Sequence, residues 1–118
     1  MQQSTRQFGQ EKEQQAYEYL TTQGLALIRK NYQCKVGEID LIMQDQETLV
    51  FAEVRFRTQN DYGGGLASVT RSKQRKIIRT AQYYLQTETT KDCPCRFDVV
   101  GIAPQKIQWI KDAFWVKC

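Results

Sequence analysis

The sequence contains no histidine and only two prolines among its 118 residues. Without histidine there can be no Ser-His-Asp or Cys-His triad, no histidine-ligated zinc and no histidine acting as a general base. The chain also lacks any run of 18 apolar residues, which excludes a helix that crosses a membrane, and no repeat or Pro/Gly-rich linker divides it. Because histidine is absent, any catalysis must use carboxylate, lysine, tyrosine or cysteine side chains.

Cysteine occurs four times, but its spacing does not favour a metal site. One residue separates Cys93 from Cys95, whereas zinc-binding pairs are usually separated by two to four, and Cys34 and Cys118 stand alone. We therefore expect reduced thiols, as in a cytosolic protein. The polar residues 1–15 lack the apolar centre of a secretory signal, which also favours a cytoplasmic location.

The length and the composition predict a single domain over residues 1–118. Hydrophobic residues make up 41% and charged residues 25%, which are ordinary values for a globular protein. Periodicity predicts the order αβββαββ, an α/β fold in which helices pack on a sheet. We expect a glycine loop at 63–65, helices over 8–22 and 70–87, and strands over 25–28, 38–43, 48–57, 96–103 and 106–110.

Two acids, Asp40 and Glu53, stand within apolar strand segments. Burying an unpaired charge is costly, so such acids need a metal ion or a basic partner. Because side chains alternate along a strand, Glu53 and Arg55 point the same way. A loop of two or four residues centred between Gln46 and Glu47 places Asp40 opposite Glu53, whereas a loop of three or five residues places them on opposite faces. The residues of the turn do not decide between these alternatives.

The chemistry of these acids predicts which ion they would bind. Carboxylate oxygens without histidine or thiolate favour Mg²⁺ or Mn²⁺, so we expect Asp40 and Glu53 to be the ligands. Glu13 falls at helical spacing with Ala16 and Leu20, on the inward-facing stripe of the first helix. We therefore expect Glu13 to add a third acid to the site.

Basic residues are concentrated after the second acid. Between Arg55 and Arg79 there are seven basic residues and one acid, an excess of +6 that leaves about −2 for the rest of a chain whose net charge is +4. Thr70 is a suitable N-cap for the second helix, and cations in its first turn oppose the helix dipole unless they meet phosphate. A solvated helix face remains the alternative, but the position after the acids favours nucleic-acid binding by Arg57, Arg71, Lys73, Gln74 and Arg75.

The acids stand in a pattern that resembles the PD-(D/E)xK nuclease superfamily, in which an acid on one strand is followed by Glu-x-Lys on the next. Here Asp40 is followed, after twelve residues, by Glu53-Val54-Arg55. More closely, the chain resembles the YraN family, small uncharacterised bacterial proteins regarded as similar to archaeal Holliday-junction resolvases. The matching segments are 13–16, 19–20, 37–42, 50–55, 63–64, 69–70, 73–74 and 95–100.

This resemblance implies a restriction-endonuclease-like fold, with a central mixed sheet flanked by helices. It also implies a magnesium-dependent endodeoxyribonuclease, selective for branched DNA, with Glu13, Asp40, Glu53 and Arg55 as catalytic residues. Because four-way junctions have two-fold symmetry, such an enzyme would act as a homodimer.

Five aromatic residues are candidates for stacking on bases: Tyr62, Tyr83, Tyr84, Trp109 and Trp115. Such residues more often fill a core or a dimer interface, which is the role we expect for them.

Arg55 departs from the superfamily pattern, which has lysine at this position. Arginine is always protonated and cannot act as a base, although it can bind a phosphate. The water would then be activated by metal alone or with another basic group, or the site is catalytically weak. Two other functions stay open: a nucleic-acid-binding module with a vestigial acid site, and a protein-interaction domain in which Arg55 neutralises the acids.

Overall fold

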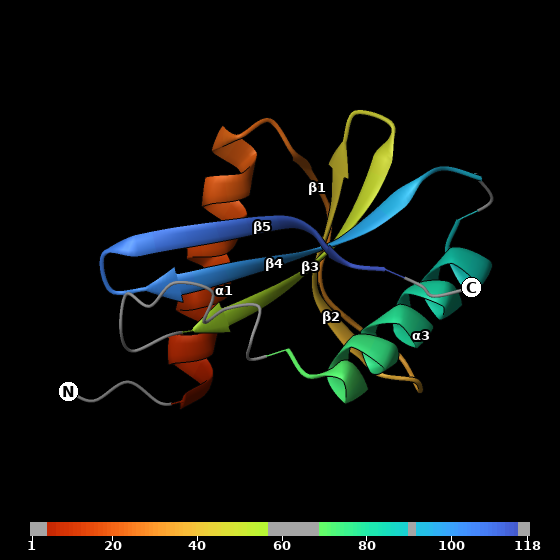
Figure 1. The fold of residues 1–118 in the computed structure, drawn as a ribbon, viewed down its shortest axis with the longest axis horizontal. Helices are drawn as coiled ribbons and strands as arrows, with labels where there is room; N and C mark the ends of the chain where they lie inside the picture. The colour runs from red at the N-terminus through yellow and green to blue at the C-terminus, as the bar shows by residue number, and fades with distance from the viewer. Residues whose placement is uncertain (1–4, 57–68, 90–91, 116–118) are drawn as a thin grey trace.

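The chain forms a mixed α/β structure in the predicted order αβββαββ (Figure 1). The computed structural model describes residues 5–56, 69–89 and 92–115, and the side chains from residue 7 onward. Arg57 and the expected glycine loop at 63–65 lie outside these residues. The elements are α1 (Thr5–Thr22), β1 (Ala26–Gln33), β2 (Glu38–Asp45), β3 (Thr48–Phe56), α3 (Arg71–Thr87), β4 (Cys95–Ala103) and β5 (Lys106–Phe114).

The strands form one mixed sheet in the order β1-β2-β3-β4-β5. Strands β3 and β4 run parallel and the other neighbours run antiparallel. Parallel neighbours need a crossover connection, and the segment that joins β3 to β4 contains α3. Figure 1 shows a strongly twisted sheet with α1 on one face and α3 on the other. The expected central mixed sheet flanked by helices is confirmed.

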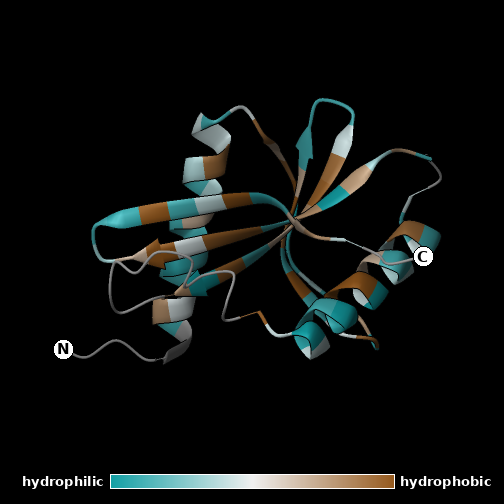
Figure 2. Ribbon diagram, in the orientation of Figure 1, coloured by the Kyte–Doolittle hydropathy of each residue, from teal (hydrophilic) through white to brown (hydrophobic). Residues whose placement is uncertain are grey.

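Both faces of the sheet are buried, which explains the continuous apolar run of β3. Leu49 and Phe51 belong to the core cluster that includes α3 residues, whereas Val50 and Ala52 belong to the cluster that includes α1 residues. In Figure 2 the strands are largely hydrophobic where they pass between the helices, and the first turns of α3 are hydrophilic. The polar end of α3 thus lies outside the core.

Helix α3 begins as expected but buries a different stripe. The Thr70 side chain accepts a hydrogen bond from the Lys73 amide at 3.2 Å, which confirms the N-cap. The spacing of Ile77, Ile78, Ala81 and Leu85 predicts that these four form the buried stripe of the helix, but Ile78 and Leu85 are only partly buried. The helix turns so that Thr80 faces inward, where its hydroxyl donates to the Lys76 carbonyl at 2.8 Å and needs no other partner. The buried residues are Ile77, Thr80, Ala81 and Tyr84.

Two strands extend at least four residues beyond their expected C-terminal ends. The strand expected over 25–28 is β1, Ala26–Gln33, and the one expected over 106–110 is β5, Lys106–Phe114. Both extensions contain polar, partly exposed residues that backbone pairing holds in the sheet, and hydropathy does not detect such pairing. Gly24 ends α1 with a φ of 100°, a conformation that glycine adopts without steric cost. Neither described helix has the length and apolar character needed to cross a membrane.

Gly37, just before β2, is expected to be a sensitive position for stability. A Cβ at this position would lie 2.7 Å from Thr80 Oγ1, a buried hydroxyl held by its own helix. Gly37→Ala should therefore lower the free energy of unfolding by about 1–3 kcal/mol in urea denaturation. Gly9→Ala is the control, because a Cβ there meets nothing within 4 Å. It should raise the stability of α1 by about 0.5–1 kcal/mol. Equal effects of the two substitutions would contradict the close approach of Gly37 to α3.

Candidate functional site

A two-residue connection, Gln46–Glu47, joins β2 to β3 and fixes their register. Asp45 pairs with Thr48 and Leu41 pairs with Ala52, and one further step in the same register brings Asp40 opposite Glu53. Gln46 supplies a positive φ of 56°, the kind of conformation that tight hairpins require. Of the loop lengths that the sequence left open, the two-residue loop is the one that forms.

Asp40 lies where the β2–β3 ladder ends. Beyond the Leu41–Ala52 pair, the Val54 amide donates a hydrogen bond to Asp40 Oδ2 at 2.8 Å. A side-chain oxygen thus takes the place of a backbone acceptor and holds the Asp40 carboxyl between the two strands.

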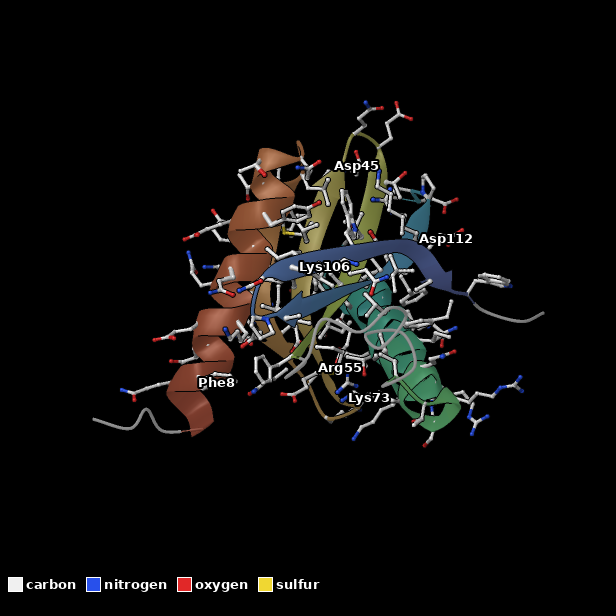
Figure 3. All side chains as sticks on the ribbon, turned by 60° about the vertical axis from the view of Figure 1, so that its left-hand side comes forward. Phe8, Asp45, Arg55, Lys73, Lys106 and Asp112 are labelled. Carbon is white, nitrogen blue, oxygen red and sulfur yellow. The ribbon has the colours of Figure 1, made fainter. Side chains whose placement is uncertain are left out.

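The Glu53 carboxyl is 6% exposed and lies beside two cations. Its Oε1 atom is 3.4 Å from Arg55 Nη2 and 3.9 Å from Lys73 Nζ. Figure 3 shows Arg55 and Lys73 close together at one end of the sheet, well away from Asp45. Arg55 comes from β3 itself, whereas Lys73 reaches the acid from the first turn of α3.

Glu13 brings a third carboxyl from α1. It shares the inward stripe with Ala16 and Leu20, which are both fully buried. Glu13 Oε1 is buried and has no hydrogen-bond partner among the described residues. Burial, followed by the nearby Asp40 carboxyl, raises the pKa of Glu13 to about 7. The expected inward position of Glu13 is confirmed.

The pKa values of the opposed acids are also raised. Burial and then the Asp40 charge raise the pKa of Glu53 to about 8, although Arg55 and Lys73 act in the opposite direction. Burial raises the pKa of Asp40 despite the hydrogen bond from Val54. Desolvation and mutual repulsion therefore disfavour ionisation, and a bound cation would offset both.

The donor set fits a hard divalent cation. Asp40 and Glu53 offer carboxylate oxygens from opposed positions, and the orphaned Glu13 oxygen lies nearby. Within residues 5–56, 69–89 and 92–115, however, no three acid, histidine or cysteine side chains are grouped closely enough to hold a metal by themselves. The arrangement is thus a two-ligand pair with Glu13 beside it, and water or substrate would complete the coordination.

The residues expected to bind nucleic acid divide between two places. Lys73 faces Glu53, while Arg71 and Arg75 are exposed on α3. The Gln74 side chain donates to the Val69 carbonyl at 2.9 Å and lines a groove with Arg71 and Arg75. Helix α3 therefore has cations on two sides, one at the acids and one away from them.

Asp98 is a fully buried acid for which the sequence analysis assigned no partner. It accepts hydrogen bonds from Arg96 Nε at 3.1 Å, Trp109 Nε1 at 2.9 Å and the Asp112 amide at 2.9 Å. Arg96 also donates to Asp45 at 2.9 Å. This network joins β4 to β5 and to the β2–β3 turn, so its role is structural. The rule applied to Asp40, that an acid within an apolar strand needs a partner, would have identified it.

The aromatic residues and the thiols follow the sequence expectations with one exception. Tyr84 is in the core cluster on the α3 side and Trp109 packs against the cluster on the α1 side, but Trp115 is 64% exposed. Trp115 therefore does not fill the core, and its place in a dimer interface stays a prediction. Cys34, Cys93 and Cys95 are unpaired thiols, as expected, and Cys118 lies outside the described residues.

Together, the sheet and its acids define a small α/β protein with a buried acidic centre between two helices. The chain belongs to the uncharacterised protein family UPF0102, whose sequence profile matches residues 12–102. That span includes Glu13, Asp40, Glu53 and Lys73. The membership agrees with the resemblance to the YraN family that the sequence indicated.

Relatives match this chain over most of their lengths. The UPF0102 protein of Psychromonas ingrahamii is 55% identical over 105 residues, which cover 86% of this chain and 84% of the relative. That of Nitrosococcus oceani is 49% identical over 114 residues and 92% of each chain. That of Alcanivorax borkumensis is 47% identical over 118 residues, which cover 95% and 94%.

The buried acids predict how stability depends on pH when divalent ions are removed by a chelator. Because the pKa of Glu53 rises from 4.5 to about 8, the folded chain binds an extra proton between these values. The contribution of Glu53 to the free energy of unfolding therefore decreases as the pH rises through this window. Glu53→Gln stays uncharged, so its stability should decline less between pH 5 and pH 8.

Urea denaturation at several pH values checks this prediction. Glu47→Gln, in the exposed β2–β3 turn, is the matched control and should follow the wild type. A Glu53→Gln curve parallel to the wild-type curve across the window would rule out a buried, proton-binding Glu53.

Proposed function

We propose that this protein is a metal-dependent endonuclease that hydrolyses phosphodiester bonds in branched DNA. The carrying observation is the opposition of the half-buried Asp40 and the buried Glu53, with two cations beside Glu53. The sheet would then be a form of the restriction-endonuclease-like fold. We expect the enzyme to act in the cytoplasm, and as a homodimer if its substrate is a two-fold symmetric junction.

Asp40 and Glu53 would hold Mg²⁺ or Mn²⁺, with Glu13 beside them and with water or substrate completing the coordination. When bound, such an ion lowers the pKa of a coordinated water and polarises the phosphate. Asp40 is held in place for ligation by the Val54 amide. The burial of Glu53 excludes water that would otherwise screen its charge.

The two cations at Glu53 have chemically different capacities. Arg55 would bind the scissile phosphate and stabilise the charge that develops on it. Lysine, unlike arginine, can serve as a base, so in this proposal Lys73 Nζ orients the attacking water and accepts its proton. In this proposal Lys73 of α3 supplies the function that the superfamily pattern assigns to a lysine at the position of Arg55. Its Nζ, 3.9 Å from Glu53 Oε1, is close enough for both groups to face one substrate.

A nucleic-acid-binding module with a vestigial acid site is the second candidate. The 3.4 Å contact between Arg55 and Glu53 favours it, because an arginine that neutralises a ligand weakens metal binding. The basic residues of α3 would then retain the affinity for nucleic acid without cleavage.

Cleavage of labelled four-way, flapped and linear DNA in Mg²⁺ or Mn²⁺ tests the proposal. The wild type should cut a branched substrate, and Glu53→Gln should abolish cutting because a ligand is lost. Lys73→Gln should reduce the single-turnover rate about 10²- to 10⁴-fold, the usual contribution of a general base. Lys76→Gln, an exposed lysine on the same helix, is the matched control and should cut within twofold of the wild type.

The outcomes separate the three functions. Intact substrates with the wild-type protein in both metals would refute the catalytic proposal. Salt-sensitive binding that survives in the Asp40→Ala, Glu53→Ala double variant would then support the vestigial module. The absence of any nucleic-acid binding at low salt, with metal present, would instead support a protein-interaction domain.

A further inference from the structure

A groove runs between α3 and the C-terminal end of β5, on the side of α3 away from Glu53. Its volume is about 600 Å³. Three arginines of α3 (Arg71, Arg75 and Arg79) line it together with Phe114 and Trp115, and no acidic side chain is among its lining residues. The acid site does not use this groove.

The three arginines form a regular row of cations. They are four residues apart, so successive positions are separated by about 6 Å along the helix axis. All three are exposed, and none has an acidic partner among the described residues. Arg29 and Arg96, by contrast, each contact a carboxylate. A row of uncompensated cations along a groove suits an extended polyanion.

Trp115 adds a stacking surface beside this row. The other tryptophan, Trp109, packs against the core and donates its indole N–H to Asp98 at 2.9 Å. Trp115 is 64% exposed, which makes it the most exposed large hydrophobic residue among those described. An exposed indole next to cations is the combination that binds unpaired bases, because every base has a flat π-face.

We propose that this groove binds an unpaired strand of nucleic acid, with bases stacked on Trp115 and phosphates along Arg71, Arg75 and Arg79. A duplex would not suit the site, because its bases are already stacked on one another. Lys73 lies in the same first turn of α3 and faces Glu53, so a strand that passes Arg71 arrives at the acid site. The inference takes nucleic acid from the proposed function and adds that the substrate carries a single-stranded arm.

Binding of the full chain to a fluorescein-labelled oligodeoxythymidine of about 20 nucleotides tests this inference. Trp115→Ala should raise the Kd about tenfold, in the range found for lost base stacking, whereas Trp115→Phe should restore most of the affinity. Arg75→Gln should also weaken binding. Its slope of log K against log salt should be smaller by about 0.7, the value for one lost contact with a single strand. A purely structural role for Arg75 would not change this slope.

Arg29→Gln is the matched control, since it removes the same charge on β1, at the opposite edge of the sheet from β5. It should change neither the Kd nor the salt slope. Circular dichroism of each variant should overlay the wild type, because the altered side chains are exposed. Unchanged binding in both Trp115→Ala and Arg75→Gln would overturn the inference.

Sedimentation identifies the other occupant that the groove could accept, a second copy of the chain. A dimer that Trp115→Ala converts to a monomer, without oligonucleotide binding, would also overturn the inference. The acid site is tested separately. Glu53-dependent cleavage with unchanged binding in Trp115→Ala would refute strand binding by the groove and leave the proposed nuclease activity supported. Trp115-dependent binding without any cleavage would support strand binding by the groove and refute the proposed nuclease activity.

Discussion

The pairing of β2 with β3 determines how the two central acids of the site, Asp40 and Glu53, lie relative to each other. With a two-residue connection at Gln46–Glu47, Asp40 stands opposite Glu53, and both carboxyls share one end of the sheet. A shift of one residue would carry one of them to the other face, because side chains alternate along a strand. Asp40 and Glu53 would then point to opposite faces of the sheet, and the pair could share neither a proton nor a metal ion.

Among the described residues, two acids are buried, Asp98 and Glu53, with opposite consequences. Asp98 is fully buried, but Arg96, Trp109 and the Asp112 amide donate hydrogen bonds to it, so the fold itself compensates its charge. Asp40 receives a hydrogen bond from Val54, Glu53 has two ion-pair contacts, and the pKa values of both are raised. Carboxyls held together against desolvation and mutual repulsion are typical of functional sites.

Helix α3 links this acid centre to a second surface. Thr70 caps the helix, Lys73 contacts Glu53 from the first turn, and Arg71 and Arg75 face the groove beside β5. Positive charges at a helix N-terminus oppose the dipole, which is a small cost that contact with an anion reverses. Helix α3 thus holds Lys73 at the acid site and presents its row of arginines to the groove beside β5.

Much of this arrangement follows from local sequence. Periodicity predicted the order of the elements, the Thr70 cap, the inward side of Glu13 and the acids within apolar strands, because each depends on neighbours a few residues away. Local sequence could not predict three other features: the approach of Lys73 to Glu53, the exposure of Trp115 and the partners of Asp98. Each depends on residues far apart in the chain or on how whole elements pack. Hydropathy also missed the ends of β1 and β5, which backbone pairing maintains. The sequence by itself determined which groups are available and their order. Only the tertiary structure decided the register and the faces, because long-range pairing and side-chain packing select among arrangements that local preferences leave equal.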